Sequence, residues 1–216
     1  MTPTRNLDLR CYFVTGPGDP ARVVDTARAA VAGGAGVVQV RSKPIDARTL
    51  TELTAAVAEA VTEINPRAKV LVDDRVDVAL ALRARGAPVH GVHVGQDDLP
   101  VRDVRALLGP DAVVGLTTGT LELVRATHDV ADALDYLGCG PFRATPTKDS
   151  GRAPIGLAGY PDLAAASPVP LIAIGDVTAD DAADLAATGV DGVAVVRGLM
   201  NAADPEAYAR RIVDAF

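Results

Sequence analysis

The sequence predicts a closed (β/α)8 barrel of the TIM type, and three observations support this fold class. Short β-branched runs recur along the chain, and Ala- and Leu-rich segments with helical periodicity separate them. Eight such strand and helix units fit into 216 residues, which we expect to form one domain, 1–216. No glycine-rich dinucleotide fingerprint follows the first strand, since TGPGDP lacks the spacing and a Walker-type lysine. An open doubly wound sheet is the alternative, but eight regular units favour closure.

The individual elements follow from local composition. The expected strands are short and rich in valine and isoleucine, and they cover 11–15, 37–41, 70–72, 89–94, 113–116, 134–138, 171–174 and 192–196. The clearest helical patterns cover 21–32, 47–64, 101–108, 179–187 and 205–215. Asp46, Thr120 and Thr178 each precede a helical pattern and are expected to cap it.

Composition limits the possible functions. A hydrophobic content of 49% with 23% charged residues is typical of a soluble globular protein. The net charge of −7 argues against wrapping nucleic acid or binding anionic lipid. MTPTRNLDLR contains no apolar stretch like a signal peptide, and no segment reaches membrane-spanning length. Cys11 and Cys139 have no metal-type spacing and are interpreted as small core side chains, so we expect a cytoplasmic protein.

In a (β/α)8 barrel, the polar residues that follow the strands gather at one rim. Here these residues are Thr15, Gln39, Arg41, Lys43, Asp73, Asp74, Gln96, Asp97, Asp98, Thr117, the loop 140–148, Gly175, Asp176 and Arg197. The set combines carboxylates with cations. Binding a metal pyrophosphate requires both chemistries.

The segment VQVRSK places Gln39, Arg41 and Lys43 at alternate positions, so their side chains leave the same face of a strand. A solvent-facing edge strand would give the same pattern. The neighbours Val38 and Val40 are apolar, however, which predicts a strand buried on both faces with cations at its end. Those cations then need an anionic partner. Only three of the 21 basic residues are lysines, which also draws attention to Lys43 and Lys148.

Two pairs of aspartates follow adjacent predicted strands: Asp73 with Asp74, and Asp97 with Asp98. One carboxylate from each pair suits Mg²⁺, which takes few protein carboxylates and completes its shell with phosphate oxygens and water. The alternative is that both pairs are helix N-caps. His90 and His93 lie three apart in a strand and point to opposite faces, so they are a poor metal pair.

The stretch GPFRATPTKDSG, which begins at Gly140, is dense in turn residues and opens a connection that reaches about Ala158. Loops of this length in compact domains are either disordered or functional. We therefore treat it as a candidate lid.

At these motifs the sequence resembles the thiamine phosphate synthase family of small (β/α)8 enzymes. The segments VQVRSK, DDRVDVAL, GVHVGQDDLP, GPFRATPTK and LIAIGD match family patterns in order, and the likeness runs from CYFVT to AVVRGLM. The resemblance implies a condensation of hydroxymethylpyrimidine pyrophosphate with a thiazole phosphate, with release of pyrophosphate. In that family the leaving group departs first, so the resemblance implies that the thiazole nitrogen would capture the pyrimidine cation that remains.

The resemblance also implies residue roles. The pyrimidine and its pyrophosphate would be held by Gln39, Arg41, Lys43 and Lys148, with Asp73 beside them, and the catalytic residues would be Arg41, Thr117 and Lys148. Mg²⁺ would be bound by Asp74 and Asp98. The thiazole substrate would face Thr145, Thr147, Gly175, Asp176, Val196 and Arg197. Closure of the loop 140–158 would keep water from the cation. The other partners implied are small molecules only, with a homo-oligomer possible in principle.

Four positions depart from the family pattern. Asp73 replaces a usual asparagine, Thr117 a usual serine, and Gly119 falls where a histidine is common. Most consequentially, IGGI reads IGDV, so Asp176 replaces a glycine at the phosphate end of the acceptor site. A carboxylate beside a phosphate costs about 1 kcal/mol at 4 Å in water and about 4 at intermediate dielectric. We expect Arg197 to offset this charge, by pairing with Asp176 or by holding the phosphate, and the acceptor to be an unphosphorylated thiazole alcohol.

Two other functions remain open at this stage. A thiazole tautomerase shares the fold, but Gly119 stands where that chemistry would use a histidine. A non-catalytic protein that binds a thiamine precursor is supported by Asp176. It is opposed by the retained cations and metal carboxylates, because a sensor needs no stabilisation of a leaving group.

Overall fold

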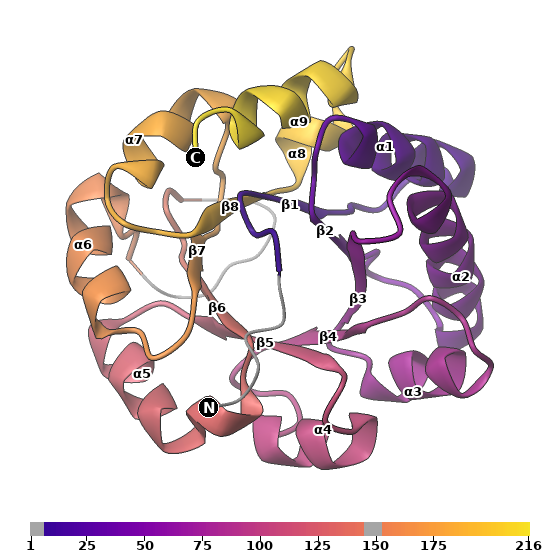
Figure 1. The fold of residues 1–216 in the computed structure, drawn as a ribbon, viewed down its shortest axis with the longest axis horizontal. Helices are drawn as coiled ribbons and strands as arrows, with labels where there is room; N and C mark the ends of the chain where they lie inside the picture. Colours follow the sequence, from indigo (N-terminus) through magenta and orange to yellow (C-terminus); the bar gives the residue numbers. More distant parts are fainter. Residues whose placement is uncertain (1–6, 145–152) are drawn as a thin grey trace.

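The computed structural model describes residues 7–144 and 153–216. Within these residues, eight parallel strands pair in chain order and close into a barrel, with β1 beside β8 (Figure 1). The strands are β1 (Cys11–Val14), β2 (Val37–Val40), β3 (Lys69–Asp73), β4 (Gly91–Val94), β5 (Val113–Thr118), β6 (Tyr136–Cys139), β7 (Leu171–Ala173) and β8 (Gly192–Val195). The predicted (β/α)8 barrel is confirmed.

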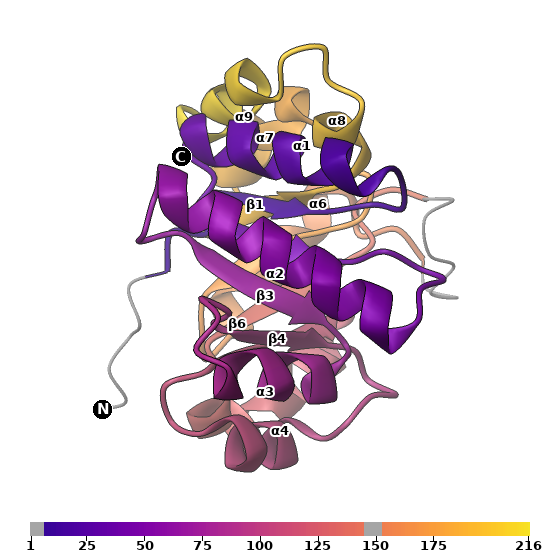
Figure 2. The same cartoon turned by 90° about the vertical axis from the view of Figure 1, so that its right-hand side faces the viewer.

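Helices surround the strands on the outside, as Figures 1 and 2 show. They are α1 (Pro20–Ala32), α2 (Ala47–Ile64), α3 (Val76–Ala84), α4 (Val101–Leu108), α5 (Leu121–Ala126), α6 (Gly156–Ala166), α7 (Ala182–Ala186), α8 (Arg197–Met200) and α9 (Pro205–Val213), with 3₁₀ turns η1 (Thr127–Ala133) and η2 (Ala179–Asp181). No helix in the described part of the chain has the length and apolar character needed to cross a membrane.

Strand alternation separates two apolar cores. Side chains such as Phe13, Val38 and Val72 point outward and pack against the helices. Their neighbours in sequence, such as Val37, Leu71 and Ile172, point inward and fill the barrel. Because the period of a strand is two, every strand except β4 supplies both apolar cores, and this explains why the strands read as nearly continuous apolar runs.

Several predicted boundaries were wrong, two of them by two residues. The sixth strand begins at Tyr136 rather than at residue 134, because the backbone N–H of Leu134 donates to the Ala131 carbonyl and closes η1. The fourth begins at Gly91 rather than at residue 89. The connection after β6 ends where α6 begins at Gly156, earlier than the predicted 158. The helical pattern at 179–187 is a 3₁₀ turn followed by the short α7.

The predicted caps are confirmed. The side chain of Asp46 accepts from the N–H of Thr49 at 3.0 Å, and Thr120 accepts from Leu123 at 3.2 Å. Thr178 forms a capping box with Asp181. Such caps satisfy backbone donors that the first helical turn leaves unpaired. Cys11 and Cys139 are fully buried free thiols, and burial raises the pKa of Cys11 to about 12, as expected for inert core residues.

His90, which lies away from the rim, makes the stability of the fold depend on pH. It precedes β4, and its Nδ1 accepts from the N–H of Val70 at 3.1 Å, which requires the unprotonated ring. Burial lowers the pKa of His90 from 6.5 to about 4, and the charges of Lys69 and Arg83 act in the same direction. Between these values the unfolded chain binds a proton that the folded chain does not, so stability falls as pH falls through this window.

We therefore expect His90→Gln to lose less stability than wild type on acidification. From pH 7 to about 4.5, the titration of His90 should remove about 2 kcal/mol from the wild-type free energy of unfolding. Denaturant unfolding at both pH values measures the difference. Equal pH dependence in wild type and His90→Gln would contradict the assignment.

Candidate active site

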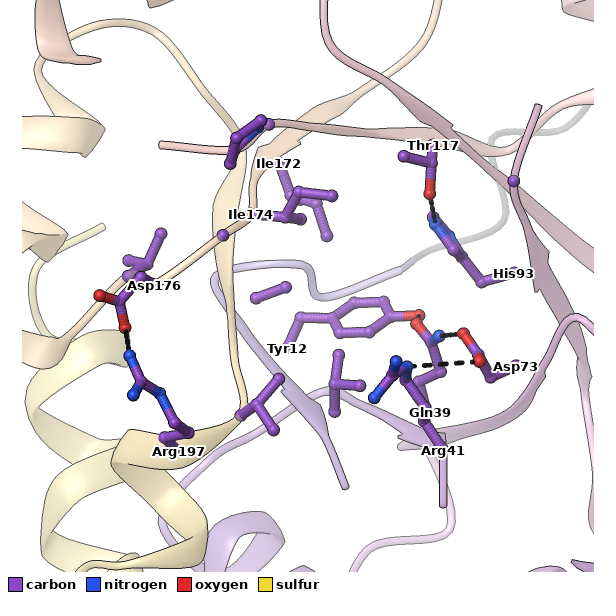
Figure 3. A pocket seen from close by; sticks show the side chains of 18 of the residues that line it. Tyr12, Gln39, Arg41, Asp73, His93, Thr117, Ile172, Ile174, Asp176 and Arg197 are labelled. Atoms are coloured by element: carbon purple, nitrogen blue, oxygen red, sulfur yellow. Dashed lines mark hydrogen bonds and ion pairs between the residues drawn. The ribbon is translucent and has the colours of Figure 1, made fainter. Parts of the chain in front are cut away.

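A cavity of about 550 Å³ opens at the carboxyl end of the strands (Figure 3). Its floor is made by inward-facing residues of the strands, including Tyr12, Val14, Ile172 and Ala194. Its polar wall contains most of the predicted site residues that the structure describes: Gln39, Arg41, Lys43, Asp73, Asp74, Thr117, Gly175, Asp176, Val196 and Arg197. The alternation of the strands and the closure of the barrel therefore bring these predicted site residues together at one end of the barrel.

The face predicted from VQVRSK points into this cavity. Gln39 is 4% exposed on β2, and Arg41 and Lys43 continue the same face beyond the strand end. The backbone of Arg41 is fixed by Thr15, whose Oγ1 accepts from the Arg41 N–H and donates to the Arg41 carbonyl, both at 2.9 Å. The edge-strand alternative is wrong, because all residues of β2 are buried.

Asp73 meets these cations across the β2–β3 pair. Its Oδ2 lies 2.9 Å from Lys43 Nζ and 3.5 Å from Arg41 Nε, while Lys43 also pairs with Asp74. Burial and the charge of Asp74 raise the pKa of Asp73 above its ordinary value. Burial lowers the pKa of Lys43, but its hydrogen bond with Asp74 and the charge of Asp73 outweigh this, so the net shift is upward.

Asp74 and Asp98 face each other from the ends of β3 and β4. Asp74 adopts a left-handed backbone conformation with φ of 57°, which non-glycine residues rarely do. Asp98 accepts from the N–H of Gly95 at 2.7 Å. Burial raises the pKa of Asp98, the Gly95 hydrogen bond opposes this, and the negative charge and hydrogen bond of Asp74 raise it further. The N-cap alternative is wrong, since Arg75 and Pro100 occupy the N-cap positions of α3 and α4.

This arrangement fits Mg²⁺. The charge of Asp74 raises the pKa of the neighbouring Asp98, so a divalent cation would relieve the repulsion at these carboxylates, and oxygen ligands are those that Mg²⁺ prefers. In residues 7–144 and 153–216, no group of three or more His, Cys, Asp or Glu side chains is arranged to hold a metal. Substrate oxygens and water would complete the shell.

The opposite wall carries a second ion pair. Gly175 and Asp176 follow β7 with φ of 93° and 59°, so Asp176 occupies a left-handed position that favours glycine. Its carboxylate pairs with the Arg197 guanidinium (Figure 3). Its carbonyl accepts from Arg143 Nη1 at 3.2 Å. The pairing of Asp176 with Arg197 is one of the two arrangements that we expected for Arg197.

Three predicted site residues, Thr145, Thr147 and Lys148, lie outside the described residues. The sequence analysis missed three others, Tyr12, His93 and Tyr136. Tyr12 and Tyr136 belong to the inner core, and His93 contacts both Tyr136 and Thr117. An available signal was the alternation of the strands, because each of the three occupies an inward position: Tyr12 pairs with Val37, His93 with Asp73, and Tyr136 with Gly115.

The chain is similar to known proteins along almost its whole length. The family model described as "Thiamine monophosphate synthase" matches residues 11–199. The chain is 67% identical over 216 residues to a thiamine-phosphate synthase of Corynebacterium efficiens, covering 100% of this chain and 98% of that protein. A thiamine-phosphate synthase of Moorella thermoacetica is 39% identical over 205 residues, covering 95% and 93%.

Among solved structures, a thiamine phosphate pyrophosphorylase from Pyrococcus furiosus superposes with a TM-score of 0.80 and 31% sequence identity, covering 97% of each chain. The sequence matches and the structural match both span almost the whole barrel, including every strand that contributes to the cavity. The chain belongs to the thiamine monophosphate synthase family.

Proposed function

We propose that this chain is a thiamine phosphate synthase, a transferase that joins hydroxymethylpyrimidine pyrophosphate to a thiazole phosphate or thiazole alcohol and releases pyrophosphate. The observation that carries the proposal is the meeting of Arg41 and Lys43 with Asp73, Asp74 and Asp98 at one mouth. Family membership supports it. Residues 1–216 would act as one barrel domain in the cytoplasm, with small molecules as ligands.

The proposed reaction needs charge neutralisation at the leaving group. The carbon–oxygen bond to pyrophosphate breaks and its electron pair leaves with the pyrophosphate. The thiazole nitrogen then donates its lone pair to the exocyclic carbon and forms the new carbon–nitrogen bond. Arg41 and Lys43 would neutralise the charge that builds on the pyrophosphate, in a cavity where such interactions are stronger than in water.

We assign Asp74 and Asp98 to Mg²⁺, on the fit described above. When bound, the ion would supply Lewis-acid stabilisation of the leaving pyrophosphate. Lys43, which pairs with Asp74 in the structure, would turn toward the pyrophosphate when the substrate binds. Thr117, Gln39 and Asp73 would contact the pyrimidine side.

The remaining assignments follow the family pattern. Lys148 would bind the pyrophosphate, and Thr145 and Thr147 would contact the thiazole. Gly175 and Val196 would contact the acceptor through their backbone groups. The segment between Gly140 and Gly156 would exclude water from the pyrimidine cation.

Release of pyrophosphate tests the proposal against a binding protein. We expect release that needs both substrates and Mg²⁺ and that stops when a chelator is added. Silence under all conditions would favour a protein that binds a thiamine precursor without reacting. Turnover of a thiazole alone, without the pyrimidine, would favour a tautomerase, which Gly119 makes the weaker alternative.

Asp176 bears on the acceptor, and we propose that it weakens binding of a phosphorylated thiazole. Asp176→Gly removes the carboxylate and frees Arg197, so we expect calorimetry to give about tenfold tighter binding of the phosphate form. Glycine tolerates the left-handed backbone, so the substitution should not strain the fold. The matched control is the exposed Asp180→Gly, which should not change the affinity. If wild type binds the phosphate more tightly than Asp176→Gly, the idea is wrong.

A further inference from the structure

A chain of hydrogen bonds crosses the barrel along the floor and wall of the cavity. We call it the relay, and its members in order are Asp73, Gln39, Tyr12, Tyr136, His93 and Thr117. The successive donor–acceptor distances are 2.5, 2.8, 2.6, 2.8 and 2.8 Å. Figure 3 shows its two ends, with Gln39 beside Asp73 and His93 beside Thr117. The relay therefore links the charged wall of the site to Thr117.

The interior is built to hold these groups together. Tyr12 and Tyr136 are 1% and 0% exposed, and their rings lie 5.6 Å apart between centroids. A Cβ at Gly115 would lie 2.1 Å from the Tyr136 ring, so only glycine leaves room for that tyrosine. At such burial an unmade hydrogen bond is costly, so each proton in the relay has a defined place.

The orientation of the relay is set at Asp73. A carboxylate only accepts hydrogen bonds, so the atom of Gln39 that lies 2.5 Å from it must be the amide nitrogen. The amide oxygen of Gln39 then faces Tyr12 and can only accept. The Tyr12 hydroxyl must therefore donate to Gln39, and its own oxygen is left to accept from Tyr136.

The donors and acceptors of the remaining hydrogen bonds follow in the same way, because each hydroxyl has one proton to donate. Burial raises the pKa of Tyr12 and of Tyr136, so both phenols keep their single proton. Tyr136 gives that proton to Tyr12 and must accept from Nδ1–H of His93. Both ring nitrogens of His93 contact uncharged hydroxyls in a position that is 7% exposed, where an imidazolium charge is costly. The neutral ring has Nε2 as an acceptor, and Thr117 donates to it.

We infer that Tyr12, Tyr136 and His93 are positioning residues that hold the Thr117 hydroxyl with its proton turned away from the cavity. Thr117 lines the cavity and then offers only lone pairs to a ligand. A group that donates a hydrogen bond, such as the amino group of an aminopyrimidine, is the complement, whereas a phosphate oxygen is not. The identity of this ligand rests on the proposed function. The assignment of donors and acceptors along the relay does not depend on it.

The first test reads the tautomer of His93 without any substrate. The chain has three histidines, so two-bond proton–nitrogen correlation spectra are simple to assign with His90→Gln and His128→Gln. We expect the Nδ1–H tautomer of His93 in wild type. In Tyr136→Phe the ring loses its acceptor at Nδ1, and we expect a change to the Nε2–H tautomer. An Nε2–H or doubly protonated ring in wild type, or an unchanged tautomer in the variant, would overturn the inference.

Tyr12→Phe provides an independent second variant if Tyr136→Phe does not fold. It leaves His93 and its neighbours in place, but it deprives Tyr136 of its acceptor, so Tyr136 can donate to His93 and reverse the tautomer. The control is Tyr160→Phe. Tyr160 is equally buried and donates to the Cys139 carbonyl at 2.9 Å, outside the relay, so the His93 signals should not change.

The second test asks whether Tyr136 acts through Thr117. We expect Tyr136→Phe to raise KM for the aminopyrimidine about tenfold with a smaller change in kcat. In a Thr117→Val background the same substitution should change KM less than about twofold, because the group it orients is gone. Equal effects in both backgrounds would contradict the inference. If wild type shows the Nδ1–H tautomer of His93 but releases no pyrophosphate, the proposed function is refuted, whereas the hydrogen-bond order of the relay is still supported.

Discussion

Asp98→Asn is expected to lower the rate of pyrophosphate release at least about 100-fold and to raise the Mg²⁺ concentration needed for half-maximal rate. The carboxylate lies beside that of Asp74, and burial together with that neighbour raises its pKa. Removing one negative charge should leave a site too weak for a divalent cation. Titration of Mg²⁺ at saturating substrates measures both effects.

The matched control for this prediction lies one residue earlier. Asp97 is exposed in the same loop and lines the cavity, and Asp97→Asn removes the same charge from the same part of the rim. We expect it to change the Mg²⁺ requirement by less than about threefold. Equal losses in the two variants would mean that only the general negative field of the rim attracts the ion, and the ligand assignment of Asp98 would be wrong.

Lys148→Ala is expected to lower kcat about a thousandfold with both substrates saturating, because a cation would be missing at the leaving pyrophosphate. Lys148 lies outside the described residues, so this expectation rests on the motif GPFRATPTK and on the proposed function. Single-turnover release of pyrophosphate separates chemistry from product release.

Lys69 provides the control for Lys148. It begins β3, at the end of the barrel opposite to Asp73, and its removal takes away the same charge far from the cavity. Lys69→Ala should keep near wild-type turnover. An unchanged rate in Lys148→Ala would refute the role assigned to that lysine, while a loss in both variants would point to an effect on folding or on net charge.

The barrel could be predicted because strand and helix periods alternate without interruption. The helices 47–64 and 101–108 were predicted to the residue, since a cap or a proline marks where each begins. The start of β6 was wrong because Leu134 is apolar both in a strand and at the end of a 3₁₀ turn, and local composition cannot distinguish these positions.

The charged half of the site could be predicted for a different reason. Charged side chains at the ends of apolar strands are conspicuous, so Arg41, Asp73 and Asp74 stood out. The relay could not be predicted in this way, because Tyr12 and Tyr136 lie within strands whose composition is that of an ordinary core. Their function depends on which neighbours close the barrel around them, and that information is distributed over strands far apart in sequence.

The separation of the two apolar cores has a consequence for adapting this protein. Residues such as Phe13 and Val38 belong to the outer apolar core, whereas their neighbours Tyr12 and Gln39 line the cavity. Thermal stability and substrate specificity can therefore change independently within a single strand, because outward positions affect the first and inward positions the second. A library that varies only the outward-facing strand residues should yield variants of higher thermal stability with an unchanged reaction.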